Sequence, residues 1–131
     1  MGLFGGKKDT RPVDEGLASL HGKTEAEAIE WWKQRLTLIA AIPSDTARVG
    51  AVTPQLRELS RIEIPDERRR LTRARLIAFA QLPADQRKIL NDARMRAWDV
   101  DAGVMTADQK LVEELLPTLD QNVRSVAPQN R

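Results

Sequence analysis

Apolar residues recur at three- and four-residue steps along most of the chain, which is the pattern of amphipathic helices. The first strong stretch begins at Thr24, because Thr24 and Glu27 have the spacing of a capping box. Pro43 predicts its end, since proline disfavours helix in the residue before it. The predicted buried face consists of Ile29, Trp32, Leu36, Ile39 and Ala40.

The next stretch is weaker. Ser44 predicts a cap for a short helical segment that Gly50 interrupts. Thr53 and Pro54 then predict a new helix, with a capping residue followed by proline at the first helical position. Its predicted buried positions are Leu56, Leu59 and Ile62.

Residues 64–98 predict two more helices, joined at Leu82-Pro83. The first has an inner stripe of Leu71, Ala74, Ile77, Ala78 and Leu82, with Phe79 beside it. In the second, the residues expected to face inward are Ile89, Leu90, Ala93, Ala97 and Trp98. Those expected to point away are Arg87, Lys88, Arg94 and Arg96.

Residues 99–105 are expected to form a loop, after which Thr106 caps a last long helix. Leu111, Val112, Leu115 and Leu116 give this helix its inner face. Pro117 predicts a break, and a further short helix follows around Val123.

No segment alternates with a period of two, so the prediction is an all-α protein, a compact bundle of five to seven short helices. Segments 35–49 and 75–89 match at five of fifteen positions and share helix–Pro–Asp–helix punctuation. The match indicates two similar helical hairpins packed together, although shared turn chemistry explains it equally well. We expect a flexible tail over 1–12, one helical domain over 13–126 and a frayed end over 127–131.

The amino-acid composition excludes several kinds of catalytic and metal site. The 131 residues are 41% hydrophobic and 31% charged, contain no cysteine and include a single histidine, His21. Thiolate chemistry, disulfides and a histidine metal cluster within one chain are therefore excluded. With no recognisable catalytic motif, we expect no enzyme, no cofactor and no metal site. No run approaches the ~20 apolar residues of a membrane span, and the N-terminus lacks a signal-peptide pattern, so we expect a cytoplasmic protein.

The net charge of +2 is unevenly distributed. Residues 66–98 hold nine basic and four acidic residues, whereas 99–131 hold three basic and six acidic. This asymmetry predicts either an acidic partner or a C-terminal segment that lies against the basic one. Arginines 68, 69, 70, 73 and 75 dominate the basic part, and the alternatives for them are a binding surface, a solvated face or internal salt bridges.

Residues Asp99–Gln109 resemble an EF-hand calcium loop, with Asp99 and Asp101 at the first and third ligand positions. The resemblance implies a calcium site between two helices. The segment lacks the residue of the fifth ligand position, and Gln109 replaces the closing glutamate. We therefore favour an interhelical turn with poor calcium affinity.

The favoured function is that of a small non-catalytic helical protein that binds another macromolecule, as an accessory, adaptor or assembly subunit. The expected partner is a protein with an acidic surface, and the predicted partner-binding residues are Arg68, Arg69, Arg73, Arg87 and Arg94. The alternative is a nucleic-acid-binding protein that uses the same arginine-rich hairpin. Peripheral membrane contact through Leu3 and Phe4 is disfavoured, because two apolar side chains anchor weakly.

Overall fold

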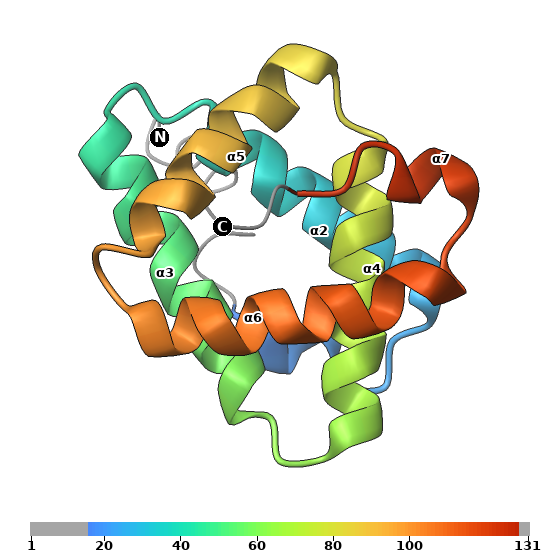
Figure 1. The fold of residues 1–131 in the computed structure, drawn as a ribbon. Coiled ribbons are helices and arrows are strands. Elements are labelled where there is room, and N and C mark those ends of the chain that lie inside the picture. Colours follow the sequence, from blue (N-terminus) through green and yellow to red (C-terminus); the bar gives the residue numbers. More distant parts are fainter. Residues whose placement is uncertain (1–15, 129–131) are drawn as a thin grey trace, which may run out of the picture.

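The computed structural model describes residues 16–128, and within this range it contains six α-helices, two short 3₁₀ helices and no strand (Figure 1). The elements are η1 (Leu17–Leu20), α2 (Glu25–Ala40), α3 (Asp45–Arg61), α4 (Pro65–Ala80), α5 (Ala84–Ala97), α6 (Ala102–Leu115), η2 (Leu116–Thr118) and α7 (Gln121–Arg124). The predicted all-α class and helix number are confirmed. The predicted tail over 1–12, with Leu3 and Phe4, lies outside the described residues, as do residues 129–131.

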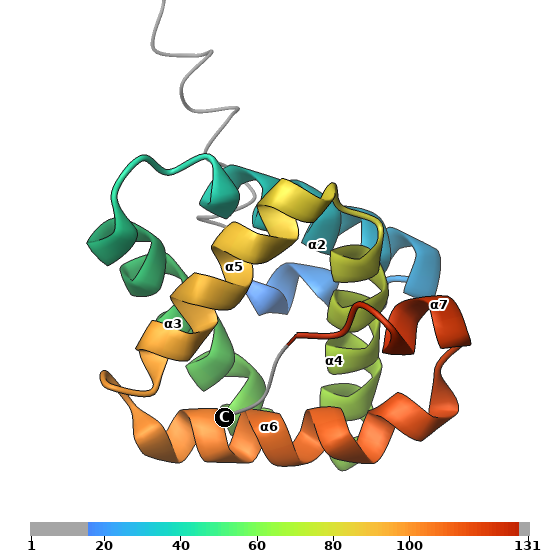
Figure 2. The same cartoon turned by 45° about the horizontal axis from the view of Figure 1, so that its top comes forward.

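The two pairs of consecutive helices that the sequence indicated pack against each other. The first consists of α2 and α3 and the second of α4 and α5; α2 packs against α4, and α3 packs against α5. Helix α6 lies across both hairpins through α3 and α4, and Figure 2 shows it running along the base of the bundle with α4 rising from it. The two halves of the bundle therefore share one core.

Several helix ends carry capping residues, and those at Thr24 and Ser44 are the predicted ones. Thr24 and Glu27 form a reciprocal capping box, and the Ser44 side chain accepts from the third residue of α3. His21 occupies the C-cap of η1, and Gly22 after it has a positive φ of 76°. Such caps satisfy backbone groups that a helix end would otherwise leave unpaired.

The predicted restart at Thr53-Pro54 is wrong, because α3 runs without interruption from Asp45 to Arg61 with Pro54 inside it. Thr53 is buried, and its hydroxyl donates to the carbonyl of Val49 one turn back at 2.9 Å. Val49, Thr53, Leu56 and Leu59 form one continuous buried stripe. Burial along the whole stripe thus outweighs the lost hydrogen bond at proline.

The predicted loop over 99–105 and its Thr106 cap are also wrong. Helix α6 begins at Ala102, and its N-cap is Asp101, whose carboxylate accepts from Val104 N at 3.1 Å. Met105 is completely buried, which explains why the helix extends to include it. The calcium-loop resemblance is lost here, because the segment up to Gln109 is helical and Asp101 is the cap.

The core is built from all the long helices. Trp32 of α2 is fully buried and meets Trp31 edge to face, with 5.0 Å between the ring centroids. The other large, fully buried side chains include Ile39, Leu76, Met105 and Val112. As predicted, α6 ends before Pro117, and a short helix, α7, follows. None of the described helices is long and apolar enough to cross a membrane.

Candidate functional site

The five predicted binding arginines do not form one surface. Arg68, Arg69 and Arg73 lie on α4, and Arg87 and Arg94 lie on α5. Arg94 was predicted to point away from the core, but only 6% of it is exposed. The prediction failed because it counted arginine as a surface residue, whereas a buried carboxylate offsets the cost of burying this guanidinium.

That carboxylate belongs to Asp108 on α6, and it binds two arginines at once. Nη2 of Arg75 donates to both Asp108 oxygens, at 2.9 and 3.2 Å. Arg94 donates to Oδ2 from Nη2 at 3.0 Å and from Nε at 3.3 Å. Burial lowers the pKa of Arg94, and the Asp108 carboxylate opposes this shift. We call these three residues the buried triad.

The sequence contains a pattern from which part of the triad could have been predicted. Asp108 falls at helical spacing from Met105, Val112 and Leu115, so it is an acid within the apolar stripe of α6. Arg94 likewise lies within the buried stripe of α5, between Leu90 and Ala97. A charged residue in each of two apolar stripes indicates a buried ion pair, because a single buried charge is too costly.

Other arginines form hydrogen bonds in the connections between consecutive helices. Three arginines at helix starts reach back to a carbonyl at the end of the preceding helix. Arg48 donates to Ile42 O, Arg68 to Ile62 O at 2.7 Å and Arg87 to Leu82 O at 2.5 Å. Helix ends leave carbonyls without partners, and a cationic donor satisfies them well. Arg87 therefore has a structural use at the α4–α5 corner.

The rest of the α4 cluster is also paired internally. Arg69 donates to Glu114 of α6 at 2.8 Å and approaches Asp66 at 3.4 Å. Arg73 lies 3.6 Å from Glu25 and donates to the carbonyl of Thr118 at 3.2 Å. The alternative of salt bridges to the acidic C-terminal segment is thus realised at Arg69.

Arg70 ties α4 to the start of the domain. It donates to the carbonyls of Lys23 at 2.8 Å and Leu20 at 3.2 Å, and it pairs with Glu67. The hydrogen bond from Arg70 lowers the pKa of Glu67. Arg70 therefore contributes mainly to the packing of η1 against α4.

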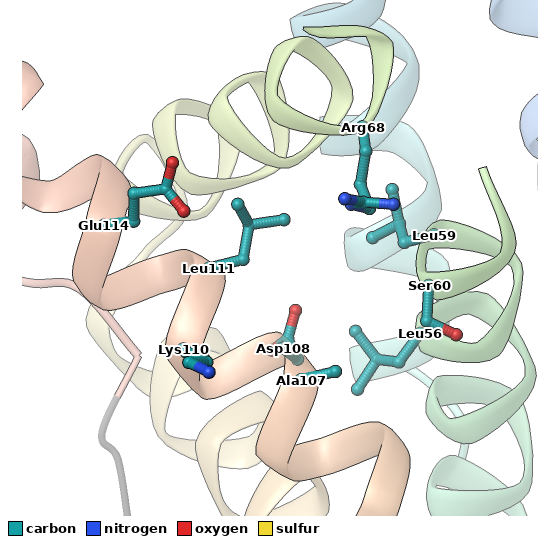
Figure 3. Close-up of a pocket in the computed structure, with 9 residues that line it drawn as sticks. All are labelled: Leu56, Leu59, Ser60, Arg68, Ala107, Asp108, Lys110, Leu111 and Glu114. Carbon is teal, nitrogen blue, oxygen red and sulfur yellow. The ribbon is translucent and has the colours of Figure 1, made fainter. Parts of the chain in front are cut away.

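Arg68 is a predicted site residue that borders a cleft. A cleft of about 330 Å³ lies between α3, α4 and α6. Figure 3 shows Arg68 reaching into it from α4 and Leu111 from α6. Its lining residues are Leu56, Leu59, Ser60, Arg68, Ala107, Asp108, Lys110, Leu111 and Glu114. We call this space the α3–α4–α6 cleft.

The cleft combines positive charge with an apolar lining. Among the described residues Arg68 makes no ion pair and donates only from Nη1, and Lys110 is exposed with no bonded partner. The two acids of the lining are already engaged, Glu114 by Arg69 and Asp108 by the buried triad. The cleft can therefore accept a negatively charged group beside an apolar one.

Within the described residues, no three His, Cys, Asp or Glu side chains lie together as a metal site requires. Comparison of the chain with protein-family models, with curated proteins and with solved structures yields no match.

Proposed function

We propose that this chain is a small non-catalytic helical protein that binds an acidic, partly apolar segment of a partner protein in the α3–α4–α6 cleft. It acts there as an adaptor or assembly subunit, in the cytoplasm. The observation that carries the proposal is the pair Arg68 and Lys110, which form no ion pair with the described residues and border the apolar side chains of the cleft.

The character of the lining supports a protein partner. Leucines 56, 59 and 111 offer apolar contact to a side chain such as leucine or methionine. Arg68 keeps two nitrogens free of partners among the described residues, and a guanidinium binds a carboxylate well through two parallel hydrogen bonds. This combination suits an amphipathic helix that presents acidic and apolar residues one turn apart.

The same contacts argue against nucleic acid as the partner. Phosphate binding needs several cations along one surface, since each neutralised phosphate adds to the affinity. Arg69, Arg70 and Arg73 instead hold acidic side chains and carbonyls of the protein itself. We therefore rank the nucleic-acid alternative below protein binding and include it as an outcome of the test.

The test uses a fluorescein-labelled helical peptide with glutamate and leucine at i, i+4 spacing, measured by fluorescence polarisation. We expect saturable binding whose affinity falls at least about tenfold in an Arg68→Gln/Lys110→Gln variant. This loss of affinity should be larger at low salt than at high salt. The matched control is Lys88→Gln, another exposed lysine on a helix, which should bind as wild type does. Melting temperatures of all variants show whether the fold is intact.

A 20-base single strand and its duplex serve as competitors in the same assay. If either binds more tightly than the peptide, the nucleic-acid alternative replaces our proposal. If the cleft variant and the control bind the peptide equally, the cleft is not the binding site.

A further inference from the structure

A groove lies between α3 and the end of α5, away from the α3–α4–α6 cleft. Its volume is about 470 Å³, and its walls include Asp99 and Val100 from the connection between α5 and α6. Figure 2 shows α3, the end of α5 and this connection together at the left edge of the bundle. We call this space the α3–α5 groove.

Gly50 is an exposed residue of the α3–α5 groove and lies in the interior of α3. Glycine stabilises a helix less than alanine does, so it is favoured there mainly where a side chain would collide with something. A Cβ at Gly50 would meet no other part of the described chain within 4 Å. The described chain therefore gives no steric reason for this glycine, whereas a second molecule whose backbone comes close would give one.

The carbonyl group of Gly50 lacks its usual helical donor. In a helix this oxygen accepts from the amide four residues on, but that residue is Pro54, which has no N–H. The neighbouring hydroxyl of Thr53 donates to Val49 O instead, at 2.9 Å. A backbone acceptor thus lies at the position where no side chain keeps another molecule away.

The groove also exposes apolar surface. Val100 is 58% exposed and is one of two large apolar side chains that stand out in this way among the described residues. Val49, which is almost completely buried, lines the same groove. Removing apolar surface from water is the main driving force of protein association. A molecule that covers Val100 therefore gains affinity.

The charges of the lining indicate what this molecule is. Two acids, Asp45 and Asp99, and two bases, Arg57 and Arg96, line the groove, so the formal charges of the lining cancel. Nη2 of Arg96 lies 3.5 Å from a carboxylate oxygen of Asp45, whereas Asp99 forms no ion pair within the described part of the chain. A surface of one sign repels its own copy, but a mixed surface can place each acid opposite a base of that copy. The positively charged α3–α4–α6 cleft lacks this property.

We propose that two copies of this chain bind to each other through the α3–α5 groove, around a two-fold axis. Gly50 lets the two α3 helices come close, the partner copy covers Val100, and Asp99 of one copy pairs with Arg96 of the other. A two-fold contact uses the same surface on both copies and is the commonest form of protein dimer. The groove shares no lining residue with the cleft proposed for the acidic partner, so either proposal can fail alone.

Sedimentation velocity of the full chain over a wide range of concentrations measures the dissociation constant of the dimer. We expect a reversible monomer–dimer equilibrium, and Gly50→Gln should raise this constant at least about tenfold because its side chain enters the contact. At a concentration where the chain is monomeric, Gly50→Gln should melt at an equal or higher temperature than wild type, because glutamine is the better helix former.

Gly103→Gln is the matched control. Gly103 is also an exposed glycine within a helix, α6, and a Cβ there would make only an ordinary contact, at 3.7 Å from Asp101. It does not line the α3–α5 groove. The dimer dissociation constant of Gly103→Gln should therefore equal that of wild type.

Two charge reversals test how the copies face each other. Asp99→Arg and Arg96→Glu should each weaken self-association, because like charges then meet across the two-fold axis. An equal mixture of the two variants should restore association, since each contact between them joins an acid to a base. The double variant Asp99→Arg/Arg96→Glu should recover self-association for the same reason.

A chain that stays monomeric at every concentration would overturn the proposal, as would equal dissociation constants for Gly50→Gln and Gly103→Gln. If Arg68→Gln/Lys110→Gln abolishes the dimer and Gly50→Gln leaves it intact, the copies meet through the α3–α4–α6 cleft and the proposal is wrong. A mixture of the two charge variants that stays monomeric would overturn the two-fold contact.

Discussion

Replacing Asp108 with asparagine tests the energetics of the buried triad most directly. Asparagine keeps the shape of the side chain and one acceptor oxygen, so packing changes little, but the negative charge is lost. The two guanidiniums it contacts, Arg75 and Arg94, then remain buried with no carboxylate between them. Breaking a buried ion pair by removing one partner costs about 3–5 kcal/mol. We expect Asp108→Asn to fall in this range, which is a large part of a typical stability of about 5–15 kcal/mol.

The number of charges in the triad also predicts how much stability the substitution Arg94→Met should cost. Wild type holds two positive groups and one negative group in the triad. Arg94→Met leaves a one-to-one pair of Arg75 and Asp108, and methionine fills much of the arginine's volume. The free energy lost in Arg94→Met should therefore be less than half of that lost in Asp108→Asn. An ordinary salt bridge between two groups would give nearly equal losses.

Urea denaturation followed by circular dichroism measures both variants, and the slope with urea should stay unchanged if only the folded state is affected. The control is Asp92→Asn, because Asp92 forms an exposed pair with Lys88 at 3.3 Å. Exposed pairs contribute little, so the control should lose no more than about 0.5 kcal/mol. A loss below about 1 kcal/mol in Asp108→Asn, or a larger loss in Arg94→Met, would refute the charge argument.

Three further changes test other parts of the fold. Pro54→Ala should raise the melting temperature, because α3 is continuous and the new amide can bond to Gly50 O; a helix that began at Pro54 would instead lose stability. Trp32→Ala should cost about 3–5 kcal/mol by urea denaturation, because Trp32 is completely buried. The hydrogen bond from Arg57 lowers the pKa of Asp101, so the unfolded chain takes up this proton first as the pH falls. Its contribution is thus present above pH ~4 and lost as the pH falls further through the folded-state pKa, and Asp101→Asn should unfold with a shallower acid dependence in a pH titration.

The helical fold was predictable because local signals and burial agree along most of the chain. Thr24 and Glu27 marked the start of α2, and the prolines at 43 and 83 marked both hairpin corners. The matching segments 35–49 and 75–89 each span such a corner. Each of these signals acts within a few residues, which is why sequence alone was sufficient.

The two errors of helix position arose where tertiary burial outweighed local preference. Thr53 is a good capping residue, yet here it is buried on the stripe between Val49 and Leu56. Thr106 lies inside α6, one position after the fully buried Met105. A capping signal carries only about 1 kcal/mol, whereas burying a large apolar side chain is worth about 1.5–3 kcal/mol.

The candidate site was predictable only in part, because the sequence shows how many arginines there are and not what each one binds. Arg68 and Arg94 looked alike as charged residues on amphipathic helices. The structure places Arg68 at a cleft and Arg94 against Asp108, fourteen positions along the chain. Arg94 is buried because Asp108 binds it, and Asp108 belongs to another helix, α6.

The internal use of arginine also limits what a partner can gain from this surface. Arg69, Arg73 and Arg87 each hold a carboxylate or a helix-end carbonyl, and a partner's acid could recruit them only by displacing that group. Such an exchange returns little net free energy, because one charge-assisted contact replaces another. Lys110 has no bonded partner among the described residues. Arg68 can bind a carboxylate through its other guanidinium nitrogens and keep the hydrogen bond from Nη1 to Ile62 O. Affinity for an acidic partner should therefore depend on these two residues far more than on the number of arginines nearby.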